Sequence, residues 1–172
     1  MKTRTKVWLI FAAFLIIAGV SILGGVMINL DWDFSELSTT QLVENTYEIT
    51  SDFTDINIVA DSADVWFYHT EDEEVSVVCY TDEKLVPEGA VTNGVLTVTV
   101  KDTRAWYEQI GINFESAKVL VYLPIGEYGK LRVNTTTGDA IISGGLTFES
   151  IDASTRTGNA FCWADAKKSI RI

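Results

Sequence analysis

The chain contains few side chains of the kinds that carry out catalysis or bind metals. His69 is the only histidine, and nothing around it resembles the nucleophile turn that a Ser–His–Asp arrangement would need. The sequence does not predict a zinc site either, because one histidine and two distant cysteines, Cys79 and Cys162, make no ligand cluster. No glycine-rich phosphate loop follows a predicted strand and opens a helix. The sequence therefore predicts a protein that is not an enzyme and has no cofactor.

Carboxylates are the one abundant reactive group. The acidic run from Glu71 to Glu74 is typical of a solvated turn. Paired carboxylates for glycoside hydrolysis would need a defined separation across a cleft, which the sequence does not provide. Calcium is a better alternative, although the chain has neither an EF-hand loop nor the GGxGxD spacing of calcium-binding β-rolls. The aspartates near predicted turns that could serve it are Asp61, Asp64, Asp139 and Asp152.

The two cysteines have the surroundings of core residues. Cys79 follows Val75 and Val77 at a period of two, and Cys162 takes the place that Ile142 has one repeat earlier. Both are predicted to be free thiols in the interior. A disulfide stays open as an alternative, because an oxidising exterior would permit one.

One pattern that could position these residues occurs three times. Each copy has an aromatic residue, apolar residues three and five positions later, a corner pair at ten and eleven, and apolar residues at twelve and fourteen. The copies begin at Phe53, Tyr128 and Phe148, and the last two are 20 residues apart, an interval typical of solenoids. A fourth copy is indicated at Ile170 and Ile172, one position early. The pattern predicts an all-β domain of stacked rungs with a β-solenoid or β-helix character.

The corner pairs have a mechanical interpretation. Glycine suits a corner that needs positive φ, and Asp or Asn can hydrogen-bond nearby backbone there. The predicted corner positions are Asp64, Gly138, Asp139, Gly158 and Asn159. Alternation and turn residues predict strands over 55–60, 64–69, 74–80, 94–101, 117–123, 130–135, 140–143, 150–154 and 159–163.

The N-terminal part predicts one transmembrane helix. Residues 7–28 carry no charge, and 22 residues at about 1.5 Å each span roughly 33 Å, enough to cross a bilayer core. Basic residues precede the run and aspartates follow it, so the positive-inside rule places the N-terminus in the cytoplasm. The expected divisions are a cytoplasmic tail (1–6), the helix (7–28), a stalk (29–46) and an extracellular β-repeat domain (47–172). A cleaved secretory signal is the alternative.

Charge limits the partners of the exterior part. All 24 acidic residues follow the apolar run, together with ten of the 13 Lys and Arg, which gives a formal charge of −14. Such a balance argues against nucleic acid and against lying flat on an anionic bilayer. A protein or an envelope polymer is the expected partner. The segment 102–116 is either a protruding loop or a short amphipathic helix. Its Trp106 and Tyr107 are the candidate contacts, although the favoured interpretation is that they cap one open end of the stack.

Three segments carry a family resemblance: FTDINI at 53–58, VLVYLP at 119–124 and LRVNTTTGDAI at 131–141. With the membrane segment, they resemble the bacterial putative-adhesin domain family, a group of membrane-anchored β-repeat proteins of undefined activity, over roughly residues 45–172. The resemblance implies a right-handed β-solenoid on the outer face of a Gram-positive type of membrane, linked in some members to envelope stress. It supplies no catalytic residue. Members usually continue through more repeats, so the domain is expected to be incomplete at its C-terminus.

The leading functional hypothesis is a non-enzymatic, single-pass surface protein that acts in adhesion or interaction at the cell envelope. The alternative is an accessory component of an envelope-stress sensing system that acts through a membrane partner. In that case Gly19, Gly24 and Gly25 could allow close packing against the partner's helix.

Overall fold

The computed structural model describes residues 3–33, 42–82, 84–105 and 116–172, and the N-terminal helix and the β domain are separate units. Helix α1 covers Thr3–Asn29, and its segment Arg4–Asn29 is long and apolar enough to cross a membrane, a test that a signal sequence also meets. The helix ends where Asp31 and Trp32 adopt positive φ and the Trp32 N–H donates to the Met27 carbonyl at 2.9 Å. The predicted apolar helix is confirmed.

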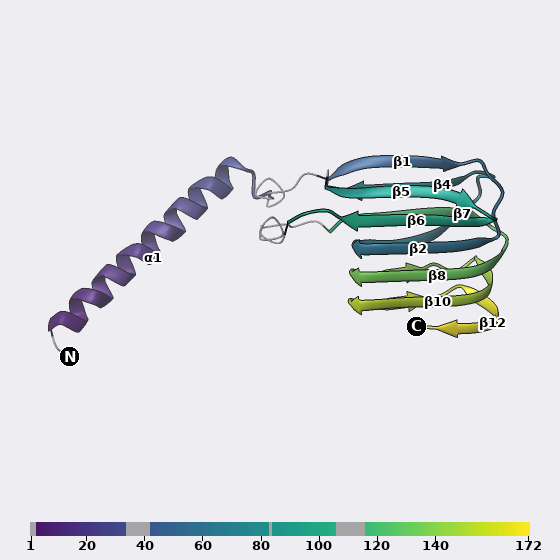
Figure 1. Ribbon diagram of the computed structural model, residues 1–172. Helices are drawn as coiled ribbons and strands as arrows, with labels where there is room; N and C mark the ends of the chain where they lie inside the picture. The colour runs from purple at the N-terminus through teal and green to yellow at the C-terminus, as the bar shows by residue number, and fades with distance from the viewer. Residues whose placement is uncertain (1–2, 34–41, 83, 106–115) are drawn as a thin grey trace. The chain divides into compact units, whose positions relative to one another are not determined.

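In the described part of the β domain, twelve strands form two six-stranded sheets. The order in sheet A is β1-β4-β7-β3-β9-β11. The order in sheet B, whose strands are labelled in Figure 1, is β12-β10-β8-β2-β6-β5. The strands of sheet A are β1 (Val43–Ile49), β3 (Asp64–Thr70), β4 (Val75–Thr81), β7 (Lys118–Pro124), β9 (Ala140–Ile142) and β11 (Ala160–Cys162). Those of sheet B are β2 (Asp55–Ser62), β5 (Leu85–Thr92), β6 (Val95–Asp102), β8 (Glu127–Thr137), β10 (Thr147–Thr157) and β12 (Asp165–Arg171).

The three sequence copies are neighbouring rungs, each with one strand in sheet B and the next in sheet A. Strand β8 pairs in parallel with β2 and β10 pairs in parallel with β8, so that Ile56, Leu131 and Ile151 lie in one column. In sheet A, β9 pairs with β3 and β11 with β9 in the same register. Because inward positions repeat at a period of two, each column is continuous across the rungs. The inward side chains of these columns form a shared core, in which Ile56, Leu131 and Ile151 are each about 1% exposed.

At the corners, neighbouring rungs are connected in two ways: their backbones approach closely at the glycines, and backbone N–H groups donate hydrogen bonds to carboxylates. Gly138 and Gly158 have φ of 136° and 146°, and a Cβ on Gly138 would lie 2.3 Å from the Ala63 carbonyl oxygen. Beside them, the Asp139 N–H donates to the Asp64 carboxylate at 2.9 Å. The Asn159 N–H donates in turn to the Asp139 carboxylate at 2.7 Å. Each acidic side chain therefore accepts a backbone hydrogen bond from the next rung.

The stack does not grow in one direction along the chain. After the rung β2–β3, strands β4 to β7 build on one side of it, and β8 to β12 build on the other. Strand β4 pairs antiparallel with β1 and β7, and β5 pairs antiparallel with β6. The prediction of stacked β-rungs is thus confirmed in its coarse form, but the sheets are mixed, which the repeat pattern does not predict. The handedness of the coil stays a prediction.

Strands β1 and β5 were not predicted, β12 was indicated only by the fourth copy at Ile170, and one boundary needs correction. Strand β1 begins at Val43, inside the range 29–46 assigned to a stalk, and α1 reaches Asn29. Its polar residues hide the alternation, but Tyr47 and Ile49 pack against the core. Strand β5 contains Pro87, and β12 is rich in lysine. In β12, Ile170 pairs with Ile151, and this pairing is one residue short of the 20-residue period, as the early fourth copy indicated.

We expect Gly138→Ala to destabilise the β domain by at least about 2 kcal/mol, because alanine would adopt positive φ and meet backbone that cannot move aside. Urea unfolding of the full chain in mild detergent, followed by the β signal in circular dichroism, measures this. The matched control is Gly89→Ala, where a Cβ meets nothing within 4 Å and the effect should stay within about 1 kcal/mol. Equal unfolding midpoints for the two variants would contradict the close approach of the backbones at the corners.

Candidate functional site: an aromatic face on sheet A

The outer face of sheet A carries a continuous apolar row. Strand registers place the outward side chains of Val78, Leu120, Trp66, Ile141 and Phe161 in line across β4, β7, β3, β9 and β11. These positions alternate with core residues such as Val65 and Phe67, which are fully buried. Outward positions of a solvated sheet are normally polar, so this row marks the face as different from the rest of the surface.

Aromatic rings pack against one another along this face. Tyr68 and Tyr122 are stacked with centroids 5.5 Å apart, and Trp66 meets Tyr68 edge to face at 6.2 Å. Further along, Phe161 and Trp163 are stacked at 5.9 Å with their planes 13° apart. We call the following set the aromatic face: Trp66, Tyr68, Leu120, Tyr122, Ile141, Phe161 and Trp163.

The face is partly desolvated at its centre and open at its β11 end. Burial raises the pKa of the Tyr68 hydroxyl, and the neighbouring Tyr122 raises it further. The indole N–H of Trp66 is buried and has no hydrogen-bond partner in the part of the chain that the structure describes. Phe161 and Trp163, in contrast, are 46% and 63% exposed. Pre-packed rings beside exposed ones resemble the aromatic centre of a protein interface before the partner binds.

The rim of the face is charged. Lys118 lies over the Trp66 ring, 5.8 Å from its centroid, and Glu48 belongs to the outward face of β1 at one end of the sheet. An apolar centre with a charged rim is suited to bind a macromolecular surface.

Sequence analysis did not identify this face. Trp66, Tyr68 and Tyr122 lie in strands that are apolar at both alternating sets of positions, and such a pattern does not show which set points outward. The available signal was their contrast with β2 and β8, whose outward residues are largely polar. The predicted contacts Trp106 and Tyr107 lie outside the described residues.

The other candidate residues serve the fold. His69 lies at the end of β3, where its Nδ1 lies 3.0 Å from the Gly144 carbonyl oxygen. Asp64 and Asp139 accept backbone hydrogen bonds at the corners, Asp61 accepts one from the Asp102 N–H at 3.2 Å, and Asp152 pairs with Arg171 at 3.9 Å. The four aspartates considered for calcium do not converge on one site. In the described residues no group of three or more His, Cys, Asp or Glu side chains is placed to hold a metal ion.

The two cysteines are free thiols in different strands of sheet A. Cys79 is fully buried in β4, and Cys162 is partly exposed in β11. Strands β7, β3 and β9 lie between them, a separation of roughly 19 Å at the usual strand spacing. A disulfide needs Cα atoms within about 7 Å, so the alternative of a bridge between these two cysteines is wrong for this fold.

Comparisons with known proteins give a family match and similarities to solved structures. A family model described as Toastrack DUF4097 matches residues 53–162. Similar solved structures include a putative cell adhesion protein from Clostridium sporogenes, with 9% identity over 70% of this chain and 59% of that one and a TM-score of 0.49. A putative adhesin from Parabacteroides distasonis has 14% identity over 73% and 56% with a TM-score of 0.42. One from Bacteroides fragilis has 12% identity over 76% and 94% with a TM-score of 0.38.

This chain therefore covers less than two thirds of the Clostridium and Parabacteroides proteins. No curated protein matches the sequence.

Burial raises the pKa of the Cys79 thiol from 9.0 to about 11. Between these values the unfolded chain loses the proton and the folded chain keeps it, so folding stability falls as the pH rises from 9 towards 11. We expect the stability advantage of the unsubstituted chain over Cys79→Ala to shrink by up to about 2 kcal/mol across this range. Urea unfolding of both chains at pH 8, 9, 10 and 11 measures it. Parallel stability curves would contradict the assignment.

Proposed function

Because the chain belongs to the Toastrack DUF4097 family, we propose that its β domain is a non-enzymatic interaction module that binds a protein partner at the bacterial cell envelope through the aromatic face. The family match confirms the resemblance to putative-adhesin domains. The names of the similar solved structures describe adhesins and a cell adhesion protein, and adhesion is the role proposed here for this chain.

The aromatic face is the observation that carries the proposal. Trp and Tyr contribute most often to the binding energy of protein interfaces, and an apolar centre with a charged rim is the arrangement that such interfaces share. The stacked pairs Tyr68–Tyr122 and Phe161–Trp163 hold their rings in place before binding. Binding of a partner would therefore cost little side-chain conformational entropy. The part of the chain after the apolar run has a formal charge of −14 and would repel an acidic polymer. A protein is therefore the proposed partner of the aromatic face.

The proposed location follows from the N-terminal helix. We propose that α1 anchors the chain in a membrane with its N-terminus in the cytoplasm and the β domain outside. The support is the apolar segment Arg4–Asn29, with Lys2, Arg4 and Lys6 on one side and Asp31 and Asp33 on the other. The right-handed coil implied by the family resemblance is part of the same proposal.

If α1 is retained as an anchor, the chain should stay in the membrane pellet after an alkaline carbonate wash, and its first residue should be that of the initiated chain. Added protease should remove the β domain from intact cells. Recovery of a soluble chain that begins after residue 28 would instead identify a cleaved signal and overturn the anchor.

We expect the double variant Phe161→Ala/Trp163→Ala to bind cells that lack the protein at least 10-fold more weakly than the unsubstituted chain. Both side chains are exposed, so their truncation removes contact area without opening the core. Fluorescently labelled full chain in nanodiscs, titrated onto such cells, gives the apparent Kd. The control is Ile125→Ala, an exposed apolar residue outside the aromatic face at 65% exposure.

Treatment of the cells identifies the class of partner. Loss of binding after protease digestion of the cell surface supports a protein. Loss only after digestion of surface glycans would assign the face to an envelope polymer, and unchanged binding by the double variant would remove the aromatic face from the account.

A further inference from the structure

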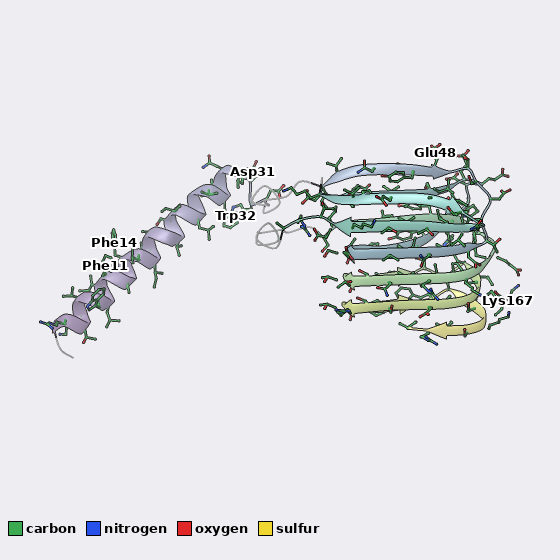
Figure 2. All side chains as sticks on the ribbon, viewed as in Figure 1. Phe11, Phe14, Asp31, Trp32, Glu48 and Lys167 are labelled. Carbon is green, nitrogen blue, oxygen red and sulfur yellow. The ribbon has the colours of Figure 1, made fainter. Side chains whose placement is uncertain are left out.

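Charge is distributed unevenly along the stack of rungs. Residues 43–105 contain 14 acidic and three basic residues, whereas residues 127–172 contain five acidic and six basic ones. The first range includes β1 and β5, which are edge strands at one end of the two sheets, and the second includes β11 and β12 at the other. Glu48 and Lys167 mark these two ends (Figure 2). Although the whole domain is strongly negative, residues 127–172 therefore have a formal charge of +1.

A groove of about 420 Å³ lies on the outer face of sheet B and extends from this part onto β2 and β6. Its lining comes from five adjacent strands, β6, β2, β8, β10 and β12. The outward side chains form two columns across β2, β8, β10 and β12. The first column contains Asp55, Lys130, Ser150 and Ser169, and the second contains Asn57, Arg132, Asp152 and Arg171.

The groove exists because short side chains lie next to long ones in these columns. Ser150 and Ser169 are neighbours in register and leave space above β10 and β12. The longer Lys130, Arg132 and Arg171 stand around that space and are exposed. At the usual strand spacing, the five strands extend the groove over roughly 19 Å, which is long enough for several groups of an extended chain.

Hydrogen-bond donors exceed acceptors in this groove. Within the described part of the chain, neither Lys130 nor Arg132 forms an ion pair, and both serine hydroxyls and the Asn57 amide add further donors. The acidic residues of the lining are already engaged. The Asp55 carboxylate accepts the backbone N–H of Lys130 at 2.9 Å, and Asp152 pairs with Arg171 at 3.9 Å.

The carboxylate of Glu149, which precedes Ser150 in β10, is engaged as well. Glu149 is bound by Lys168, and this hydrogen bond lowers the Glu149 pKa, to which the more distant Lys130 adds. Lys130 and Arg132 therefore remain available to an anion from solution.

We propose that this groove binds anionic oxygen groups, phosphate or carboxylate, carried at intervals on an extended polymer. Lysine and arginine side chains donate charge-assisted hydrogen bonds to such groups, and a guanidinium can bind two of their oxygens at once. The hydroxyls of Ser150 and Ser169 contribute neutral donors between the charges. This site is separate from the aromatic face, since it lies on the other sheet, and it does not depend on the partner proposed there.

The test uses the full chain in nanodiscs of uncharged lipid, titrated with labelled inorganic polyphosphate and with polygalacturonate at about 50 mM salt, where surface charges are weakly screened. Inorganic phosphate serves as the monomer. We expect both polymers or one of them to bind, the monomer to bind more weakly, and the affinity to fall as salt increases. The polymer that binds identifies the anionic group.

Matched variants locate the binding. Arg132→Gln should weaken polymer binding at least fivefold, and Lys130→Gln/Arg132→Gln at least 20-fold, whereas Arg156→Gln, an equal change of charge on an exposed residue of β10 outside the groove, should change it less than twofold. The aromatic-face variant Phe161→Ala/Trp163→Ala should bind the polymers normally. Equal losses for Arg132→Gln and Arg156→Gln would show general charge attraction and overturn the site, as would no binding of either polymer.

Discussion

The hydrogen bond from a backbone N–H of one rung to a corner carboxylate of the rung before it is the interaction on which the rest of the domain depends. Asp64 and Asp139 make it at 2.9 and 2.7 Å, and Gly138 lets the backbones approach closely enough. Because side chains alternate along a strand, a slip of one residue would exchange the inner and outer faces. These corners therefore set the register that buries Ile56, Leu131 and Ile151 in one column and leaves the outward rows exposed.

Two surfaces of different character follow from that register. Sheet A presents aromatic rings, and sheet B presents serines and basic side chains around a groove. The edge strands restrict how each sheet could pair with another chain. Strand β11 has three residues, and β12 carries Lys167, Lys168 and Arg171, a charge pattern that discourages edge-to-edge aggregation. Binding through the two broad faces is consistent with edges that are guarded in this way.

The sequence was sufficient to predict the rungs whose two strands both follow the repeat. Phe53, Tyr128 and Phe148 begin copies that occupy adjacent rungs, even though the first two are separated by strands β4 to β7. The order of the stack could not be predicted, because equal spacing does not show on which side of a rung the next one lies. Strand β5 was missed because Pro87 and Gly89 contradict strand propensity, and an edge strand tolerates both. The aromatic face was missed because Trp66 and Tyr122 are apolar residues beside core residues, and only the register shows which of them point outward.

Most of the side chains that could have carried out chemistry are used to hold the chain together. The Cys79 thiol fills the core, His69 packs at a corner beside Gly144, and the corner aspartates bond to backbone. A side chain that makes such a structural contact cannot exchange it for a ligand without destabilising a rung. It is therefore poorly suited to reversible ligand binding. The outward side chains of both sheets are not needed to stabilise the fold in this way, since the core and the corner hydrogen bonds already fix the strands. In a fold of this kind, variation at outward positions can change what is bound without changing the fold, and we infer that function is located there.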